Sequence, residues 1–430
     1  MKHHILITRA AAFAACVLGA GCLAAQTTLG DCYTAAEAHY PLIAQYGLTE
    51  RARDYNLENA ARSWWPQLQA EATAQLQSDV TELPFDLTRL GLSGVDVPQL
   101  SKSRYNATVS LTQRLYDGGD VAARRAAVRA DADVNREQTA TALYALREQV
   151  NQLYFGILLT QEQLRINALL QDNLSLNLSR TESMMQGGMA HDADLDAIRV
   201  ELIKARQTAD DYQSTRRAYT AMLAAMTGLA LTDTTTLVTP AEPMLPATAP
   251  AAGRPEMRGF DAQLRQVEAS RRQLDAQLRP RLSLFAQGSY GRPGLNMFKN
   301  DFTFYGLAGL RLTLNISQLY TCKADKALLD ARAEDVGIQR AAFVYRQGID
   351  AAERGEQLHR YTALLRRDGE IISLRERIRR AAETKYAGGT MTATDLMRDI
   401  NDEQQARLDR ALHEMQRLLA AYNLRFTLGE

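Results

Sequence analysis

The prolines restrict the possible folds of this chain more than any other feature. All eleven lie in two bands, from Pro41 to Pro98 and from Pro240 to Pro293, which leaves residues 99–239 and 294–430 without any. Proline breaks the hydrogen-bonding pattern of an α-helix, so these two intervals are free to be helical. Residues 119–186 are rich in Ala, Leu, Arg, Glu and Gln and predict one helix of about 68 residues, roughly 100 Å long. A compact globular domain does not contain a helix of that length.

The two intervals repeat one pattern at a constant offset of 201 residues. Gly187-Gly188 recurs as Gly388-Gly389, and Asp194-Leu195 recurs as Asp395-Leu396. In each copy the glycine pair ends a long helix. The apolar residues of the helix after Gly187-Gly188 recur at spacings of three and four, as in a coiled coil. A constant offset over about 120 residues indicates an internal duplication.

Each half also contains a pair of strands with one apolar and one polar face. In residues 105–116 apolar side chains alternate with Asn, Thr, Ser and Arg, and residues 302–316 do likewise. A partner strand precedes each, which predicts β-hairpins over 66–116 and 280–316. Such strands are typical of a transmembrane barrel wall, although a soluble sandwich shows the same alternation. Four strands cannot close a barrel, which needs about eight or more, so we expect the chain to assemble with copies of itself.

The first residues predict export from the cytoplasm. Basic residues precede an apolar run at 10–25 that is too short to span a membrane, so residues 1–25 resemble a signal peptide. Two kinds of processing fit this segment: cleavage after Ala25 and lipidation at Cys22. Gly19 stands where an aliphatic residue is expected three positions before a lipidated Cys, which favours cleavage.

The predicted domain organisation follows from these patterns. The signal peptide (1–25) is followed by a first repeat (26–235), a linker (236–258) and a second repeat (259–430). The first repeat contains a helix, the β-hairpin 66–116 and a long helical hairpin over 119–228. The second repeat contains a helix, the β-hairpin 280–316 and a long helical hairpin over 317–428.

Composition argues against several classes of function. Lys plus Arg equals Asp plus Glu at 50 each, so net charge gives no reason to expect nucleic-acid binding. The six His are scattered without the spacing of metal ligands. The sequence contains no phosphate-binding loop, nucleophile elbow or paired catalytic carboxylates. We therefore expect neither an enzyme nor a cofactor.

The signal peptide, the duplicated hairpins and the motif Gly-Gly-x-x-x-x-x-Asp-Leu at each helical turn resemble the TolC-like outer-membrane efflux protein family over essentially the whole mature chain. The resemblance implies a mainly α fold with membrane β: an antiparallel α-helical coiled-coil barrel, in the periplasm, and a homotrimer whose four strands per protomer complete a 12-stranded barrel in the outer membrane. It also implies passive transport as the exit duct of a tripartite efflux pump or type I secretion system. The expected partners are a periplasmic adaptor, an inner-membrane pump and outer-membrane lipid.

The resemblance also suggests which residues form functional sites. The two helical turns would dock the adaptor through Gly187, Gly188, Met189, Gly388, Gly389 and Thr390. Thr390 departs from the hydrophobic residue that is usual in the family, and the alternative is that the glycines only turn the chain.

A periplasmic gate is the second site that the resemblance suggests. Asp395 matches an aspartate that faces the closed aperture in the family, while a second family aspartate falls on Arg398, with Asp399 adjacent. Arg398 could instead form a salt link to an Asp of a neighbouring protomer. The alternative for Asp395 is a helix cap formed with Thr392.

A rival interpretation of the whole chain is a periplasmic coiled-coil scaffold or adaptor without a pore. It explains the long helices equally well, but it does not explain two matched amphipathic hairpins.

Overall fold

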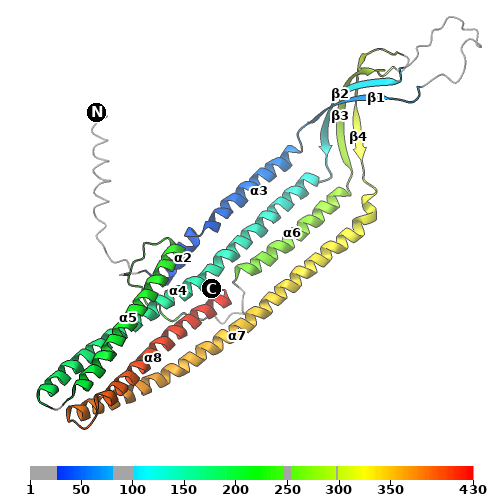
Figure 1. Ribbon diagram of the computed structural model, residues 1–430. Coiled ribbons are helices and arrows are strands. Elements are labelled where there is room, and N and C mark those ends of the chain that lie inside the picture. The colour runs from blue at the N-terminus through cyan, green and yellow to red at the C-terminus, as the bar shows by residue number, and fades with distance from the viewer. Residues whose placement is uncertain are drawn as a thin grey trace, which may run out of the picture. The chain divides into compact units, whose positions relative to one another are not determined.

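A computed structural model describes residues 27–80, 101–188, 190–233, 235–245, 253–296 and 299–429 (Figure 1). The predicted signal peptide with Cys22, and Met189 at the first helical turn, lie outside the described residues. The chain divides into two compact units. The helical unit comprises residues up to 46, 138–258 and 340 onward, and the sheet unit comprises residues 47–137 and 259–339.

The described chain is mainly helical with four strands, which confirms the predicted fold class. Its longest helices, α4 and α7, contain 67 and 70 residues. No described helix is both long enough and apolar enough to cross a membrane. The elements in chain order are α2 (Leu29–His39), η1 (Pro41–Ile43), α3 (Ala44–Arg62), β1 (Gln67–Leu76), β2 (Ser103–Tyr116), α4 (Asp120–Gln186), α5 (Asp192–Thr227), α6 (Pro255–Gln277), β3 (Arg281–Arg292), β4 (Thr303–Thr313), α7 (Gln318–Ala387) and α8 (Ala393–Leu428).

The sheet unit contains one antiparallel sheet in the order β1-β2-β3-β4. Its register places Ala70 opposite Val109, and Leu284 opposite Leu310. The alternation seen in the sequence gives this sheet one polar face and one apolar face. Large side chains on the apolar face are exposed: Leu68, Val109, Phe304, Leu310 and Leu312. Within the described residues, β1 and β4 each pair on one side only.

The helical unit contains the turns of two hairpins, α4 with α5 and α7 with α8, which match at the offset seen in the sequence. Gln186 ends α4 and Ala387 ends α7, 201 residues later, and α5 and α8 begin at Asp192 and Ala393, again 201 residues apart. In each hairpin the turn contains a glycine in the left-handed region, with φ of +74° at Gly188 and +69° at Gly389. Residues with a Cβ rarely adopt this conformation, which explains the glycine pairs.

A buried core joins α2 to both hairpins of the helical unit. Val150, Tyr154 and Leu223 are fully buried in it, beside Cys32 of α2. The Tyr154 hydroxyl lies 2.9 Å from the carbonyl oxygen of Thr27 and 2.7 Å from that of Val238, and its single proton is shared between these two acceptors. The parallel bridge between Thr27 and Leu237 adds to this anchor. The segments before α2 and after α5 are therefore held to the centre of α4.

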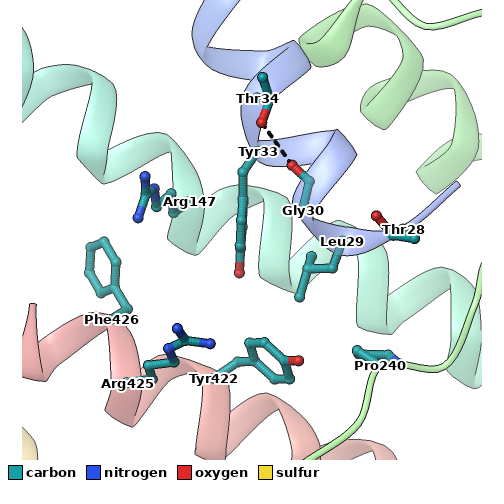
Figure 2. Close-up of a pocket in the computed structure, with 10 residues that line it drawn as sticks. All are labelled: Thr28, Leu29, Gly30, Tyr33, Thr34, Arg147, Pro240, Tyr422, Arg425 and Phe426. Atoms are coloured by element: carbon teal, nitrogen blue, oxygen red, sulfur yellow. Dashed lines mark hydrogen bonds between the residues drawn. The ribbon is translucent and has the colours of Figure 1, made fainter. Parts of the chain in front are cut away.

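A hollow of about 480 Å³ opens beside this core (Figure 2). Tyr33 reaches into it from α2, and Arg147 lies over the Tyr33 ring with its guanidinium carbon 5.6 Å from the ring centroid. Tyr422 and Phe426 line the hollow from α8. Burial raises the pKa of Tyr33 well above its ordinary value, so its hydroxyl stays neutral and donates a hydrogen bond to the Asn151 side chain.

Leu223→Ala tests the importance of this core. We expect it to lower the free energy of unfolding by about 2 to 5 kcal/mol, because a fully buried leucine leaves a cavity when it is truncated. Met222→Ala, at the neighbouring exposed position of α5, is the matched control and should change stability by less than about 1 kcal/mol. Urea unfolding followed by circular dichroism measures both. Equal losses would show that Leu223 does not pack as described.

Candidate functional site at the turns of the two helical hairpins

The first turn joins α4 to α5 through Gly187 and Gly188. A Cβ added at Gly188 would meet no atom within 4 Å, so its glycine is required by the backbone conformation and not by lack of space. The backbone N–H of His191 donates a hydrogen bond to the Asp194 carboxylate at 3.0 Å, which fixes the start of α5. This turn therefore combines a fixed backbone with a surface that other side chains of the chain leave open.

In the second turn, from α7 to α8, the polar atoms of Thr390 are turned toward the end of α7. The backbone N–H and the hydroxyl of Thr390 both donate to the carbonyl oxygen of Lys385, each at 3.0 Å. Thr390 thus completes the end of α7 with its polar atoms. A Cβ at Gly389 would also meet no atom within 4 Å, so the two turns share their open surroundings.

Asp395 is bonded within its own helix start. Its backbone N–H donates to the Thr392 hydroxyl oxygen at 3.1 Å, and the Thr392 hydroxyl donates to the Asp395 carboxylate at 2.8 Å. The other carboxylate oxygen lies 3.8 Å from a guanidinium nitrogen of Arg398. Thr392 is the N-cap of α8, and a carboxylate in the first turn also interacts favourably with the helix dipole. The capping contacts are present, and the role of Asp395, Arg398 and Asp399 as a gate stays a prediction.

A hollow of about 530 Å³ lies between α5 and α8, just beyond the turns. Asp196 and Val200 line it from α5, and Met397, Arg398 and Asp402 line it from α8. Its wall combines apolar carbon with charges of both signs. This composition suits contact with another protein better than the binding of a small molecule.

Two polar contacts connect the hairpins near the turns. The Glu201 carboxylate on α5 accepts hydrogen bonds from Lys204 at 2.8 Å and from Asn401 of α8 at 3.1 Å. Burial alone would raise the pKa of Glu201, but these two hydrogen bonds outweigh it and hold the pKa below its ordinary value. The Thr181 and Tyr386 hydroxyls lie 2.8 Å apart and join α4 to α7.

An apolar core supports these contacts. Leu174 and Ile198 of the first hairpin and Leu396 and Met397 of the second are buried together in one cluster. Both turns are therefore carried by one packed body within the helical unit. Among the described residues, no group of three or more His, Cys, Asp or Glu side chains could hold a metal ion.

Comparison with known proteins identifies the kind of chain that carries these turns. Residues 32–229 match the family described as outer membrane efflux protein. A solved structure of CusC is similar with a TM-score of 0.69 at 13% sequence identity, over 93% of this chain and 92% of that one. The first half of the chain is therefore similar to the outer membrane efflux protein family, and the whole chain shares its fold with a solved structure of CusC.

Further solved channels have the same fold as this chain. VceC from Vibrio cholerae gives a TM-score of 0.65 at 14% identity, over 94% of this chain and 97% of that one. The open state of the MtrE outer membrane channel from Neisseria gonorrhoeae gives 0.64 at 16% identity, over 93% and 88% of the two chains. A search of curated proteins by sequence gave no significant match.

These similarities agree with several expectations from the sequence. They support the predicted location in the outer membrane, with the helical part in the periplasm. The family and its structural neighbours are channels and not enzymes.

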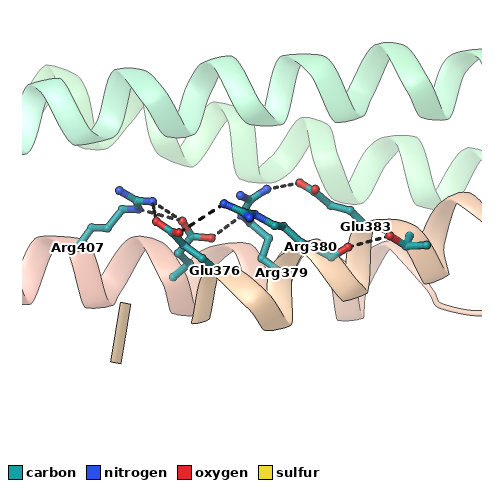
Figure 3. Close-up of polar contacts among 7 residues, drawn as sticks. Glu376, Arg379, Arg380, Glu383 and Arg407 are labelled. Atoms are coloured by element: carbon teal, nitrogen blue, oxygen red, sulfur yellow. Dashed lines mark hydrogen bonds and ion pairs between the residues drawn. The ribbon is translucent and has the colours of Figure 1, made fainter. Parts of the chain in front are cut away.

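A network of ion pairs distinguishes the two hairpins. Arg379 of α7 forms an ion pair with Glu403 of α8 and another with Glu383 of its own helix, and Glu403 also accepts from Arg407 of α8 at 2.8 Å. Glu376 of α7 pairs with Arg407 as well (Figure 3). Glu403 is only 5% exposed, so its charge depends on these guanidinium groups. We call this network the ionic seam.

The first hairpin has leucines where the ionic seam has its central pair. Counting back 201 residues, Arg379 corresponds to Leu178 and Glu403 to Leu202, while Glu383 and Arg407 keep their charges as Glu182 and Arg206. Leu202 is buried, and Leu178 packs against the same core. The repeat offset could have revealed this difference in the sequence, but a search for motifs does not detect it.

The variant Glu403→Leu tests the ionic seam. We expect it to lower the free energy of unfolding by about 3 to 5 kcal/mol, because Arg379 would then lack its buried partner. The double variant Arg379→Leu/Glu403→Leu is the matched control, since it gives the second hairpin the leucine pair of the first, and it should restore most of the loss. Chemical unfolding of the purified variants measures both. If the double variant is as unstable as the single one, the ionic seam contributes stability beyond the mutual neutralisation of its own buried charges.

Proposed function

We propose that this protein is the passive exit duct of a tripartite efflux pump, which lets substrates cross the periplasm and the outer membrane. The observation that carries the proposal is the four-stranded sheet with an exposed apolar face and two open edges. A sheet of this kind suits a barrel wall with lipid on one side and water on the other. The alternative, a periplasmic scaffold without a pore, gives no reason for exposed side chains such as Phe304, Leu310 and Leu312.

The number of strands is consistent with a homotrimer. Barrel closure needs about eight or more strands, and three copies of this sheet supply about twelve. Cyclic symmetry would join the open edge of β1 in one copy to the open edge of β4 in the next. No backbone hydrogen-bonding group of the sheet edges would then face lipid unpaired, which a membrane requires.

The two helical turns would dock a periplasmic adaptor, which connects the duct to an inner-membrane pump. Their backbones are fixed by glycines in the left-handed region, their surroundings are open, and the hollow between α5 and α8 begins directly behind them. Energy for transport would come from the pump, so the duct needs no active site of its own.

Oligomeric state and conductance test the duct directly. We expect the mature chain, extracted from outer membranes in detergent, to have the mass of a trimer and to give small, mostly closed single-channel currents in planar bilayers. A soluble monomer without conductance would refute the duct and favour the scaffold.

A pair of neighbouring substitutions tests which face of the sheet meets lipid. Val109→Arg should strongly reduce trimer assembly in the outer membrane, because arginine on a lipid-facing strand costs about 2 to 4 kcal/mol near the centre of the bilayer. Ser110→Arg places the same charge on the opposite face of β2 and should leave assembly largely intact. The yield of trimer in outer-membrane fractions measures both. Equal yields would contradict the assignment of the faces.

Arg398→Ala tests the gate. The pair with Asp395 is long and exposed, so its loss should hardly affect stability. If Arg398 holds the closed aperture by a link between protomers, closed-state conductance should rise several-fold in planar bilayers. Arg199→Ala is the matched control, since Arg199 forms a similar exposed pair with Asp196 on α5. Unchanged conductance in Arg398→Ala would exclude the locking role.

A further inference from the structure

We propose that the sheet unit contains an anion-binding site on its polar face, where the strands meet the helices, and that this site gives the duct a preference for anionic solutes. The inference rests on the proposed function as a channel, and it adds the class of substrate. The comparisons with other channels do not assign a charge preference to this chain.

The site is a hollow of about 560 Å³ in which positive charge dominates. Arg114, Arg124, Arg279 and Arg281 line it, and Asp120 is the one acidic residue among the lining residues in the described part of the chain. The rest of the wall consists mainly of side chains that can donate hydrogen bonds: Gln273, Gln277, Thr313, Asn315 and Gln318. The lining comes from β2, α4, β3, β4, α6 and α7 and from the short segments between them, so the fold builds the hollow from parts far apart in the sequence.

Asp120 offsets only part of the charge of the four arginines. Its carboxylate forms ion pairs with Arg114 at 3.7 Å and with Arg281 at 3.6 Å, both longer than a hydrogen bond. The Arg114 Nη1 atom is buried and makes no hydrogen bond among the described residues. The same nitrogen has Asp120 as its ion-pair partner at 3.7 Å, and an anionic ligand would supply the hydrogen-bond acceptor that it lacks.

The two arginines that belong to strands, Arg114 and Arg281, lie on the polar face of the sheet. Arg281 is paired with Thr313 in the ladder between β3 and β4, and the next pair, Leu282 with Leu312, points to the opposite face. Leu312 is 70% exposed on that apolar face. In β2, Arg114 is paired with Ser283, which lies on the polar face with Arg281. The hollow therefore opens toward the water-filled interior of the proposed barrel, and a dissolved anion is a better occupant than a lipid headgroup.

The chemistry of the lining indicates the type of anion. Guanidinium groups bind carboxylate, phosphate and sulfate groups through paired N–H donors, and the amide side chains add neutral donors around them. Three copies of the hollow would form a positively charged ring at one level of the duct. Rings of charged side chains set ion preference in channels. We infer that organic anions with a carboxylate, phosphate or sulfate group pass more readily than cations of similar size.

The full-length protein in planar bilayers tests this inference, with inorganic phosphate as the probe. We expect the reversal potential in a KCl gradient to show a preference for chloride over potassium, and phosphate to reduce the chloride current. In Arg124→Gln/Arg281→Gln the chloride preference should fall, and the phosphate concentration for half-block should rise about tenfold or more, because charge-assisted hydrogen bonds are lost. Arg272→Gln on α6 removes the same charge outside the lining and should behave like the unmodified protein.

The outcomes separate this inference from the proposed function. Conductance with unchanged selectivity and unchanged phosphate block in the double variant would overturn the anion site and leave the duct intact. Unchanged selectivity with loss of co-purified phospholipid would overturn it in favour of a lipid headgroup site. If even the unmodified protein inserts without conducting, the duct fails. In that case the anion site is tested by itself, by calorimetric titration of phosphate into the detergent-solubilised protein and into the double variant. Equal phosphate affinities of the two proteins would overturn the anion site.

Discussion

The open edges of the sheet are the constraint on which the rest of the structure depends. In the described chain, β1 and β4 each leave a row of backbone N–H and C=O groups without a partner strand, beside an apolar face that is exposed. In a membrane each unpaired group costs several kcal/mol, so the edges must join those of other copies. The proposed trimer would meet this requirement. Because α4 begins at Asp120, shortly after β2 ends at Tyr116, edge pairing would also fix where the long helices start.

Much of this fold could be predicted from the sequence because its signals are local. Glycine pairs mark the ends of α4 and α7, and Thr392 with Asp395 marks the start of α8. Alternation over 105–116 predicts the strand that is found at Ser103–Tyr116. The predicted strand over 302–316 is shorter in the structure, Thr303–Thr313, because α7 begins soon afterwards. The ends of strands are harder to predict from the sequence than their centres, because alternation does not show where the pairing between two strands stops.

Contacts between elements could not be predicted in the same way. The pairs Arg379 with Glu403 and Thr181 with Tyr386, and the arginine hollow, join residues that are far apart in the sequence. Periodicity shows which face of a helix is apolar, but not which charged residue will meet which partner. Of the predicted tip residues, Gly188 and Gly389 have the expected backbone, and Thr390 turns its polar atoms toward α7. Docking by these residues stays a proposal.

The ionic seam gives the two halves of the duplicated chain different responses to their surroundings. Leucine contacts strengthen when salts such as sulfate are excluded from protein surfaces, whereas the partly exposed ion pair of the seam, Arg407 with Glu376, weakens as ionic strength rises. The periplasm exchanges small ions with the medium outside the cell. A change in external salinity would therefore alter the packing stability of α7 with α8 more than that of α4 with α5. The salt content of the growth medium would thus affect the second hairpin more than the first.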